Sequence, residues 1–506
     1  MNLRDLFATV RTSHVGCRQT GVRATIVAMK CRNGHGAKGC RKMDVKSHRH
    51  QQGTDSKPNQ STPATVIRPV GSTQAGEAKA TSSLRERWAW VEAGVWTDRM
   101  LTALEQGVKG GVWFSLSDKV WHRPNLRSAW LNTAANKGSP GVDDITIASY
   151  QREAQKNLEH LSQSLRNGSY RPKAIRRVHI PKGDGKTRPL GIPTVQDRIV
   201  QGAILHIIEP IFERQFAEQS YGFRPGRGCK DALRRVDQLL KAGYGYVVDA
   251  DLKSYFDTIP HDRLMQVLRR TIADKPLLTL IERFLHANIM EETSTWKPTT
   301  GAPQGAVLSP LLSNIYLNDL DHLMARNGQR MVRYADDFVI LCQTREQADQ
   351  ALAMVREWTA QSGLTLHPEK TRIVHAATEC FEFLGYRFDQ GRKFPRKKSL
   401  RKLRDAIRER TRRTNGQSME KIIQTINPTL RGWFNYFQHC YRTTFPTEDG
   451  WIRMRLRSIL RKRCGRTGHG RGEDHKRWPN AYFSGLGLYS LTKAHQTVCE
   501  SLKGAH

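Results

Sequence analysis

The sequence has 506 residues, of which 82 are Lys or Arg and 47 are Asp or Glu, for a formal net charge of +35. One hydrophobic core rarely organises a chain of this length, so about two to four domains are expected. Such a charge repels itself in a compact monomer unless a polyanion shares the surface, which makes nucleic acid the first partner to consider. A ribosome-associated or simply basic soluble protein is the alternative, because net charge does not specify fold.

The nine cysteines do not have the paired spacing of a disulfide framework or a structural zinc site. The segment CRNGHGAKGC at 31–40 has the wrong ligand spacing for the common zinc classes. No apolar run approaches the roughly 20 residues that a membrane-spanning helix needs. We therefore expect a protein of a reducing cytoplasm that does not use a membrane, and the pattern gives no oligomeric state.

The composition changes near residue 83. Residues 1–82 are rich in Gly, Ser, Thr, Lys and Arg and have almost no periodic apolar pattern, which predicts a disordered basic arm. A start codon placed too early would give the same appearance. From 83 to 390, helical segments alternate with short strand-like runs, as in α+β proteins. The strongly basic remainder returns to helical spacing over 391–445 and 446–506.

The segment MVRYADDFVILC at 331–342 predicts a β-hairpin with Asp336 and Asp337 at its tip. Adjacent carboxylates repel unless a divalent cation neutralises them, and a solvated polar turn is the alternative. Upstream, a predicted strand ends at Asp251, so three carboxylates from two strands could hold two Mg²⁺ ions for nucleotidyl transfer. Asp249 shares the strand face of Asp251, but its place nearer the strand interior favours pairing with a basic neighbour.

A series of segments from about residue 130 to residue 445 resembles a reverse transcriptase of the group II intron-encoded, or maturase, type. They are, in chain order, NKGSPGVDDITI, YRPKAIRRVHIPKGDGKTRPLGIPTVQDRIVQ, QSYGFRPGRGCKDAL, DADLKSYFD, GAPQGAVLSPLLSNIYLNDLD, RYADDFVIL, GLTLHPEKT and FEFLGYRF, followed by the maturase marker LRGWFNYF. The resemblance implies an α+β right-hand polymerase. Fingers and an antiparallel palm sheet would occupy 83–390, a basic α-helical thumb/maturase domain 391–445, and a DNA-binding-like region 446–506.

The implied activity is that of an RNA-directed DNA polymerase that copies RNA from a DNA primer with dNTPs and two Mg²⁺ ions. The implied partners are group II intron RNA, whose splicing and mobility the protein would assist, and target DNA. A cytoplasmic, nucleoid- or ribonucleoprotein-associated location follows. A splicing-only RNA-binding maturase and a domesticated reverse transcriptase in phage defence or CRISPR adaptation are the alternatives. The intact aspartates argue against the first, and LRGWFNYF favours the intron over the second.

The resemblance assigns metal binding to Asp251, Asp336 and Asp337, with the carbonyl of Leu252 as a further ligand. Because successive strand residues face opposite ways, only one of the hairpin pair can point squarely at the ions, and Asp336 is expected to be the closer. Lys370 would protonate the departing pyrophosphate, unless it is a surface charge at the start of a helix.

The implied dNTP contacts are Lys182, Arg188, Phe256 and Gln304. Phe256 would clash with a 2′-hydroxyl and so select dNTPs, although an aromatic after a strand is otherwise a core residue. Arg188 and Lys182 would meet the triphosphate, Lys182 being equally suited to a solvated surface. Gln304 stands between Pro303 and Gly305, which let the backbone approach a ligand closely.

The basic tail is expected to bind RNA through Arg431, Trp433 and Tyr436, although at least two of the aromatics in RGWFNYF are expected in the thumb's own core. FLGY at 383–386 would seat the primer or form a buried strand. Many relatives end in a His-Asn-His endonuclease with paired cysteines, whereas only Cys464 and Cys499 follow NYFQHC here. This predicts no endonuclease, and a primer made by other means such as nascent strands at a replication fork.

Overall fold

The computed structural model describes residues 84–183, 186–470 and 472–503, without the side chains of 182, 183, 186, 502 and 503. The expected arm at 1–82 lies outside these residues. From residue 90 onward the described chain belongs to one compact unit, and residues 84–89 belong to another. The fold set out below is that of residues 90–503. No helix within the described ranges is long and apolar enough to cross a membrane.

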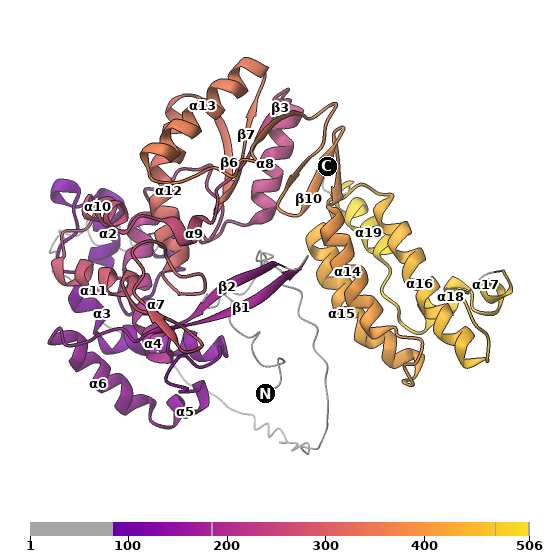
Figure 1. Ribbon diagram of the computed structural model, residues 1–506, viewed down its shortest axis with the longest axis horizontal. Helices are drawn as coiled ribbons and strands as arrows, with labels where there is room; N and C mark the ends of the chain where they lie inside the picture. The colour runs from indigo at the N-terminus through magenta and orange to yellow at the C-terminus, as the bar shows by residue number, and fades with distance from the viewer. Residues whose placement is uncertain (1–83, 184–185, 471, 504–506) are drawn as a thin grey trace, which may run out of the picture. The chain divides into compact units, whose positions relative to one another are not determined.

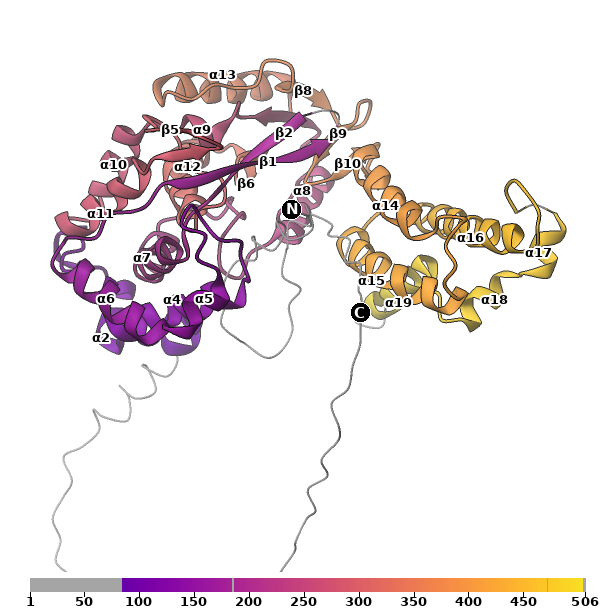
Figure 2. The ribbon, with the colours of Figure 1, turned by 60° about the horizontal axis from the view of Figure 1, so that its bottom comes forward.

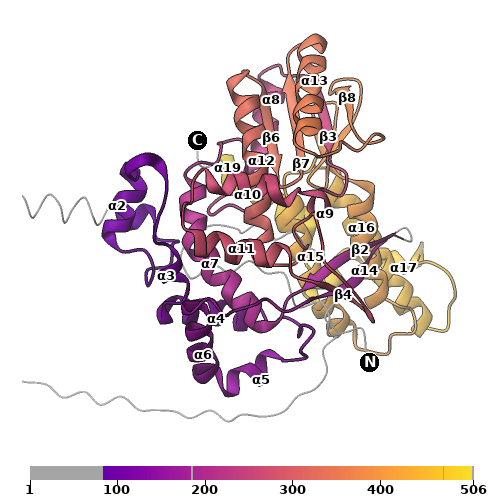
Figure 3. The ribbon, with the colours of Figure 1, turned by 60° about the vertical axis from the view of Figure 1, so that its left-hand side comes forward.

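The first part of this unit consists of helices and one long hairpin. Its elements are α2 (Asp98–Gln106), the 3-10 turn η1 (Lys109–Gly111), α3 (Ser117–Val120), α4 (Arg123–Ala135), α5 (Ile147–Arg152), α6 (Ala154–Arg166), β1 (Ile175–Gly183), β2 (Lys186–Ile192) and α7 (Val195–Glu213). Helix α7 is buried on nearly every side, as a core helix is, and it packs along α4 (Figure 3).

The next part alternates helices and strands. It comprises α8 (Cys229–Lys241), β3 (Tyr246–Asp251), α9 (Tyr255–Thr258), α10 (His261–Arg269), α11 (Lys275–Leu285), β4 (Ile289–Glu291), β5 (Ser294–Trp296), α12 (Ser309–Arg326), β6 (Arg330–Tyr334), β7 (Asp337–Cys342), α13 (Arg345–Gln361) and β8 (Arg372–His375). The predicted strand ending at Asp251 and the predicted hairpin around Asp336 are both confirmed.

The central sheet has the order β6-β7-β3-β8, with every neighbouring pair antiparallel (Figure 1). Helices α12 and α13 pack on the sheet face that carries Phe338 and Ile340, while α8 packs on the opposite face against Val339 and Leu341. Both faces are therefore covered at one end of the sheet, which explains why its strands are apolar runs that do not alternate with polar residues.

The structure has two further sheets, of four and of three strands. The first, with the order β2-β1-β4-β5, joins β1 to β4 in parallel and the other pairs antiparallel. The second is an antiparallel sheet of β9 (Phe381–Phe383), β10 (Tyr386–Asp389) and β11 (Arg392–Pro395). The β9–β10 connection uses positive φ angles at Leu384 (+48°) and Gly385 (+82°), so FLGY forms a tight turn between two short strands.

The remainder of the chain is helical, as expected (Figure 2). Its helices are α14 (Lys397–Arg410), α15 (Met419–Phe437), α16 (Thr444–Arg463), α17 (Glu473–Arg477), α18 (Asn480–Gly485) and α19 (Leu491–Lys503). Apolar residues of α15, α16 and α19 share one buried cluster. Helix α16 runs across the expected boundary between 445 and 446, and the division of the tail into two regions stays a prediction.

Gly222 fits against the β6–β7 turn. A Cβ atom at this position would lie 2.4 Å from the backbone nitrogen of Ala335 and 2.9 Å from the carbonyl carbon of Tyr334. The Gly222 carbonyl also accepts a hydrogen bond of 2.7 Å from Asn314 Nδ2. Only glycine allows the two backbone segments to lie this close together.

We expect Gly222→Ala to lower the free energy of unfolding by about 1–3 kcal/mol, because the added methyl group meets backbone atoms that cannot rotate away. Urea unfolding measures the change. Gly450→Ala in α16 is the matched control, since a Cβ there meets nothing within 4 Å, and its stability should stay the same or rise slightly. Equal stability of Gly222→Ala and the parent would contradict this packing.

Candidate active site

Carboxylates gather where β3 ends and β7 begins. Asp251 is the last residue of β3 and pairs in register with Asp337, the first residue of β7. Directly paired residues of antiparallel strands point to one face, and Asp249 shares that face two residues earlier. Asp336 lies in the β6–β7 turn after Ala335, whose φ angle is +59°. The register gives Asp337 the place opposite Asp251, and the choice of Asp336 as the closer ligand stays a prediction.

The electrostatic cost of this cluster appears in its pKa values. The pKa of Asp337 is raised to about 7 by burial and then by surrounding carboxylates, that of Asp336 foremost, against a backbone hydrogen bond from Leu384. Burial raises the pKa of Asp249 to about 6, although Arg372 Nε lies 3.8 Å from its Oδ2 and favours the charged form. The expected pairing of Asp249 with a basic neighbour is confirmed. Carboxylates placed this way favour a cation between them.

Lys370 lies against this cluster. Its ammonium group forms an ion pair with the carboxylate of Asp251. The backbone holds the two segments together, because the His367 N–H donates to the Asp251 carbonyl at 2.7 Å and the Lys370 N–H turns back to the His367 carbonyl at 3.3 Å. The side chain is 56% exposed, so it can exchange Asp251 for a ligand or for solvent. Lys370 is therefore ion-paired at the cluster, and its role as an acid stays a prediction.

The carbonyl of Leu252 points toward the hairpin acids. The carbonyl of Asp251 and the N–H of Lys253 are both used by the segment that contains Leu366, on the β8 side of β3. Since successive carbonyls of a strand point to opposite sides, the Leu252 carbonyl points to the β7 side, where Asp336 and Asp337 lie. Sequence and backbone direction thus agree on Leu252 as a possible oxygen donor.

These donors fit a hard divalent cation. In the part of the chain that the structure describes, no three acidic, His or Cys side chains already converge on one point as a metal cluster. Mg²⁺ is usually coordinated by one or two carboxylates together with substrate phosphates and water. Asp251, one hairpin aspartate and the Leu252 carbonyl would therefore be enough ligands from the protein. A metal ion at Asp251 would take over the neutralising role of the Lys370 ammonium.

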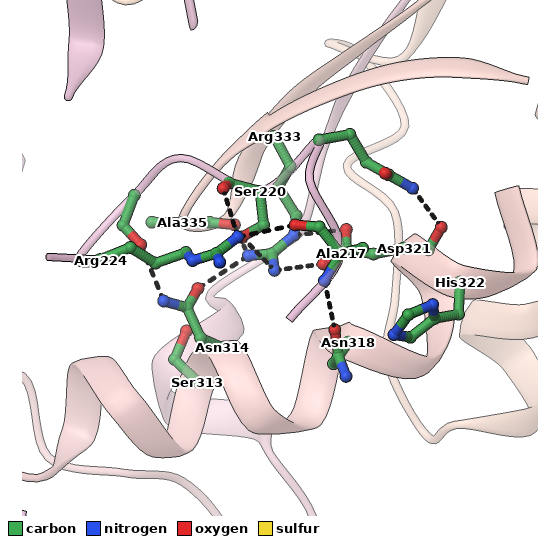
Figure 4. Close-up of polar contacts among 12 residues, drawn as sticks. Ala217, Ser220, Arg224, Ser313, Asn314, Asn318, Asp321, His322, Arg333 and Ala335 are labelled. Carbon is green, nitrogen blue, oxygen red and sulfur yellow. Dashed lines mark hydrogen bonds and ion pairs between the residues drawn. The ribbon is translucent and has the colours of Figure 1, made fainter. Parts of the chain in front are cut away.

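A buried ion pair fixes the turn that carries Asp336 (Figure 4). Arg333 and Asp321 are both fully buried, with Nε to Oδ1 at 2.7 Å and Nη2 to Oδ2 at 2.5 Å. Nη1 of Arg333 donates to the Ala335 carbonyl and to Asn314 Oδ1, each at 2.9 Å. The guanidinium thus joins β6 and helix α12 to the backbone immediately before Asp336.

Sequence reasoning missed this pair. The available signal was a single arginine within the apolar strand MVRY, because a buried guanidinium requires a partner. The neighbouring segment supplies a second such arginine, Arg224, which forms an ion pair with Glu213 at 2.7 Å. Arg224 also donates hydrogen bonds to the carbonyls of Ala217 and Ser220 (Figure 4). No periodicity selects Asp321 or Glu213 among the other acids as the partners.

Phe256 and Gln304 are brought together by backbone contacts. The Ala302 N–H donates to the Phe256 carbonyl at 2.7 Å, and the Gly191 N–H of β2 donates to the Gln304 carbonyl at 2.6 Å. Gly305 has a φ angle of +107°, and a Cβ there would lie 2.5 Å from the Gly191 carbonyl oxygen. The backbone around Gln304 thus lies close to β2, while its predicted approach to a ligand stays a prediction. Gln304 and the residue after Phe256, Asp257, line the same small pocket.

The predicted triphosphate contacts lie on the β1–β2 hairpin. Arg188 is exposed on β2, opposite Ile180. It acts on the carboxyl group of Asp257, since burial raises the pKa of Asp257 while Arg177 and Arg188 oppose the rise. Arg188 is thus within electrostatic reach of the Phe256 turn. The side chain of Lys182 lies outside the described residues.

The FLGY turn links the carboxylates to the helical tail. Leu384 supplies the backbone hydrogen bond to Asp337, and its carbonyl accepts one of 2.7 Å from the Tyr436 hydroxyl. The Tyr386 hydroxyl donates in return to the Tyr436 carbonyl at 2.5 Å. A role for Leu384 at the carboxylates was not foreseen, because a backbone N–H leaves no trace in the sequence.

The predicted RNA-binding residues separate on α15. Trp433 is 3% exposed and packs with Phe437 at a ring distance of 5.0 Å, so its ring has no face for a base. The expected RNA contact by Trp433 is corrected to a core role, and the expectation of at least two core aromatics is confirmed. Arg431 is exposed and lies 5.5 Å over the ring of Tyr489. Tyr436 is half-buried, with its hydroxyl engaged by Leu384.

Comparison with known proteins identifies the family. Residues 180–388 match the family described as reverse transcriptase (RNA-dependent DNA polymerase), and residues 400–478 match the group II intron, maturase-specific domain. Protein YkfC of Escherichia coli K12 is 36% identical over 303 residues, which are 52% of this chain and 79% of YkfC. The chain belongs to the group II intron-encoded reverse transcriptases. It therefore contains an RNA-directed DNA polymerase domain followed by a maturase domain.

Other relatives are aligned over shorter regions. Group II intron-encoded protein LtrA of Lactococcus lactis subsp. cremoris is 39% identical over 196 residues, which are 38% of this chain and 32% of LtrA. Among solved structures, a chain of a partial Cas6-RT-Cas1–Cas2 complex is 23% identical, with a TM-score of 0.32 over 49% of this chain and 41% of that chain. The α+β reverse transcriptase fold with its palm sheet and helical maturase region is the expected one.

Breaking the buried pair tests its role in this reverse transcriptase. Arg333→Met leaves the Asp321 charge buried without its partner, so we expect the free energy of unfolding to fall by about 3–5 kcal/mol. Arg333→Met/Asp321→Leu removes both charges and should recover part of that stability. It should not recover primer extension, because the bond to the Ala335 carbonyl is still lost. Urea unfolding and primer extension measure the two effects, and full extension by the double variant would contradict the assigned role.

Proposed function

We propose that this reverse transcriptase copies RNA into DNA by two-metal nucleotidyl transfer at Asp251, Asp336 and Asp337, and that it assists splicing and mobility of a group II intron. The carrying observation is the direct register of Asp251 opposite Asp337, with the pKa of Asp337 raised to about 7 by burial and neighbouring carboxylates. A protein concentrates carboxylates in this way where a cation is to be bound.

Each residue of the cluster has a task under this proposal. Bound Mg²⁺ would activate the primer 3′-hydroxyl and stabilise the leaving pyrophosphate. Asp251 and the hairpin aspartates hold the cations, and the Leu252 carbonyl adds a neutral oxygen. Lys370 is ion-paired with Asp251. A cation bound at Asp251 would release the Lys370 ammonium group, which then donates a proton to the departing pyrophosphate.

The dNTP is bound between the β1–β2 hairpin and the turn after β3. Arg188, with Lys182, meets the triphosphate, since a guanidinium offers a fork of donors to phosphate oxygens. Phe256 lies under the sugar and excludes a 2′-hydroxyl. Gln304 orients the nucleotide, because the glycine beside it lets this loop approach the Gly191 backbone closely.

Nucleic acid is bound by the basic helices and the FLGY turn. The maturase domain implies binding of intron RNA, and exposed Arg431 on α15 is our candidate phosphate contact there. Tyr436 acts through the Leu384 turn that would seat the DNA primer. The basic region over 446–506 is proposed to bind target DNA by charge.

We expect Asp336→Ala/Asp337→Ala to abolish primer extension on an RNA template with Mg²⁺ and dNTPs while leaving RNA affinity unchanged, since the cations and the basic helices are separate sites. Extension of a labelled primer and filter binding measure the two properties. Asp349→Ala, which removes an exposed aspartate of α13, is the control and should behave as the parent. Extension by the double alanine variant would refute the assignment. Absent extension by the parent, with RNA bound tightly, would favour a splicing-only maturase.

A second pair of variants separates RNA contact from packing on α15. Arg431→Gln should weaken RNA binding and reduce the slope of log affinity against log salt by about 0.7, the value for one phosphate contact to a single strand. Trp433→Ala should lower the free energy of unfolding by about 3–5 kcal/mol, because it empties a core position. Affinity at several salt concentrations and urea unfolding measure these effects. Unchanged stability of Trp433→Ala would contradict its core role.

A further inference from the structure

A second cavity opens at the outer edge of the palm sheet. Its volume is about 430 Å³, and its lining includes Glu218, Tyr221, Arg235, Gln329, Arg330 and Met331. Strand β6 is the edge strand of the sheet, and Arg330 stands at the end of β6 opposite the Asp336 turn. The cavity is therefore separate from the carboxylate cluster.

Two arginines of this cavity are not paired with an acidic side chain of the described residues. The side chains of Arg235, half-buried on α8, and Arg330, exposed at the start of β6, form no ion pair with any residue that the structure describes. Nearby arginines differ in this respect, because Arg224 is paired with Glu213 and Arg333 is paired with a buried aspartate. The guanidinium groups of Arg235 and Arg330 give the cavity an excess of positive charge that one acid of the lining, Glu218, does not cancel.

The cavity also offers an aromatic ring and a free backbone edge. Arg227 lies 5.8 Å over the ring of Tyr221, which keeps the ring in a cationic environment. The Arg333 N–H donates to the Gln219 carbonyl and the Tyr221 N–H donates to the Arg333 carbonyl, each at 2.9 Å. Because alternate strand residues point their backbone groups to one side, the N–H and C=O of Met331 point outward along the same edge. They provide one donor and one acceptor next to the ring.

We propose that this cavity binds one nucleotide of single-stranded RNA. Phosphate groups are bound by Arg235 and Arg330, and the base lies near Tyr221 with the Met331 backbone at its edge. The volume lies in the range of small-ligand sites, and aromatic rings beside guanidinium groups are the usual platform for unpaired bases. An acidic peptide would use the charges but not the ring. The proposal rests on the proposed handling of RNA by this protein and adds a contact behind the polymerase centre.

The test uses the full-length protein and a ten-nucleotide oligouridylate that carries 5-iodouridine. Ultraviolet cross-linking followed by mass spectrometry of the peptides should find an adduct at Tyr221. Arg235→Gln/Arg330→Gln should reduce the yield of that adduct at least tenfold, since two charged hydrogen bonds to phosphate are lost. Glu218→Gln should raise the yield, because it removes the opposing charge. Arg356→Gln, an exposed arginine of α13 outside the cavity, should leave it unchanged.

Several results would overturn the proposal. They are the absence of an adduct at Tyr221 while other segments of the parent cross-link, an equal yield from Arg235→Gln/Arg330→Gln, and displacement by oligoglutamate at lower concentration than by unlabelled oligouridylate. The single variant Arg330→Gln changes an exposed side chain and keeps the test valid if the double variant fails to fold. Primer extension on a short template should be unaffected in all variants. Absence of primer extension by the parent would count against the polymerase activity. The Tyr221 adduct tests RNA binding in the cavity separately.

Discussion

Mutual repulsion of carboxylates held at one end of a sheet is the constraint around which this structure is built. Asp251 and Asp337 are paired across two strands, and Asp336 follows within the adjoining turn. In water such groups would separate, but the register of β3 and β7 prevents it. Burial first, and then the neighbouring carboxylates, raise the pKa of Asp337. The Lys370 ammonium and the Leu384 N–H reduce the repulsion without removing it, so the cluster retains an affinity for added positive charge.

The second electrostatic device has the opposite character. Arg333 and Asp321 form a fully buried ion pair, which contributes little net stability because both groups lose their hydration. The pair instead fixes the position of the turn, because the same guanidinium also donates a hydrogen bond to the Ala335 carbonyl. Together with the close approach of Gly222, it leaves the turn before Asp336 one backbone arrangement. A loop that carries mutually repelling side chains requires support of this kind, since its own charges oppose the folded geometry.

In the maturase domain, the aromatic cluster of helix α15 and the exposed side of that helix are separate. LRGWFNYF combines one arginine with four aromatic residues, and in a sequence this combination fits both stacking on bases and packing of an amphipathic helix. Helix periodicity puts Trp433 and Phe437 on one side, within the buried cluster that also contains apolar residues of α16 and α19. Arg431 lies on the other side. The core role of these rings agrees with their burial, because large aromatic side chains contribute most to stability when they are removed from water.

The sequence alone predicted the elements that depend on local chemistry. Apolar runs that end in aspartates predicted β3 and the β6–β7 hairpin, and the order of motifs predicted the α+β polymerase followed by helices. The sequence did not predict which distant residues pair with one another. Three contacts illustrate this: Arg333 with Asp321, Asp337 with the Leu384 N–H, and the Leu384 carbonyl with the Tyr436 hydroxyl. Each contact joins residues from different elements of the fold. Two of the contacts use backbone atoms, which are the same in every residue. Only the folded chain, by bringing such groups within hydrogen-bonding distance, decides which residues are partners.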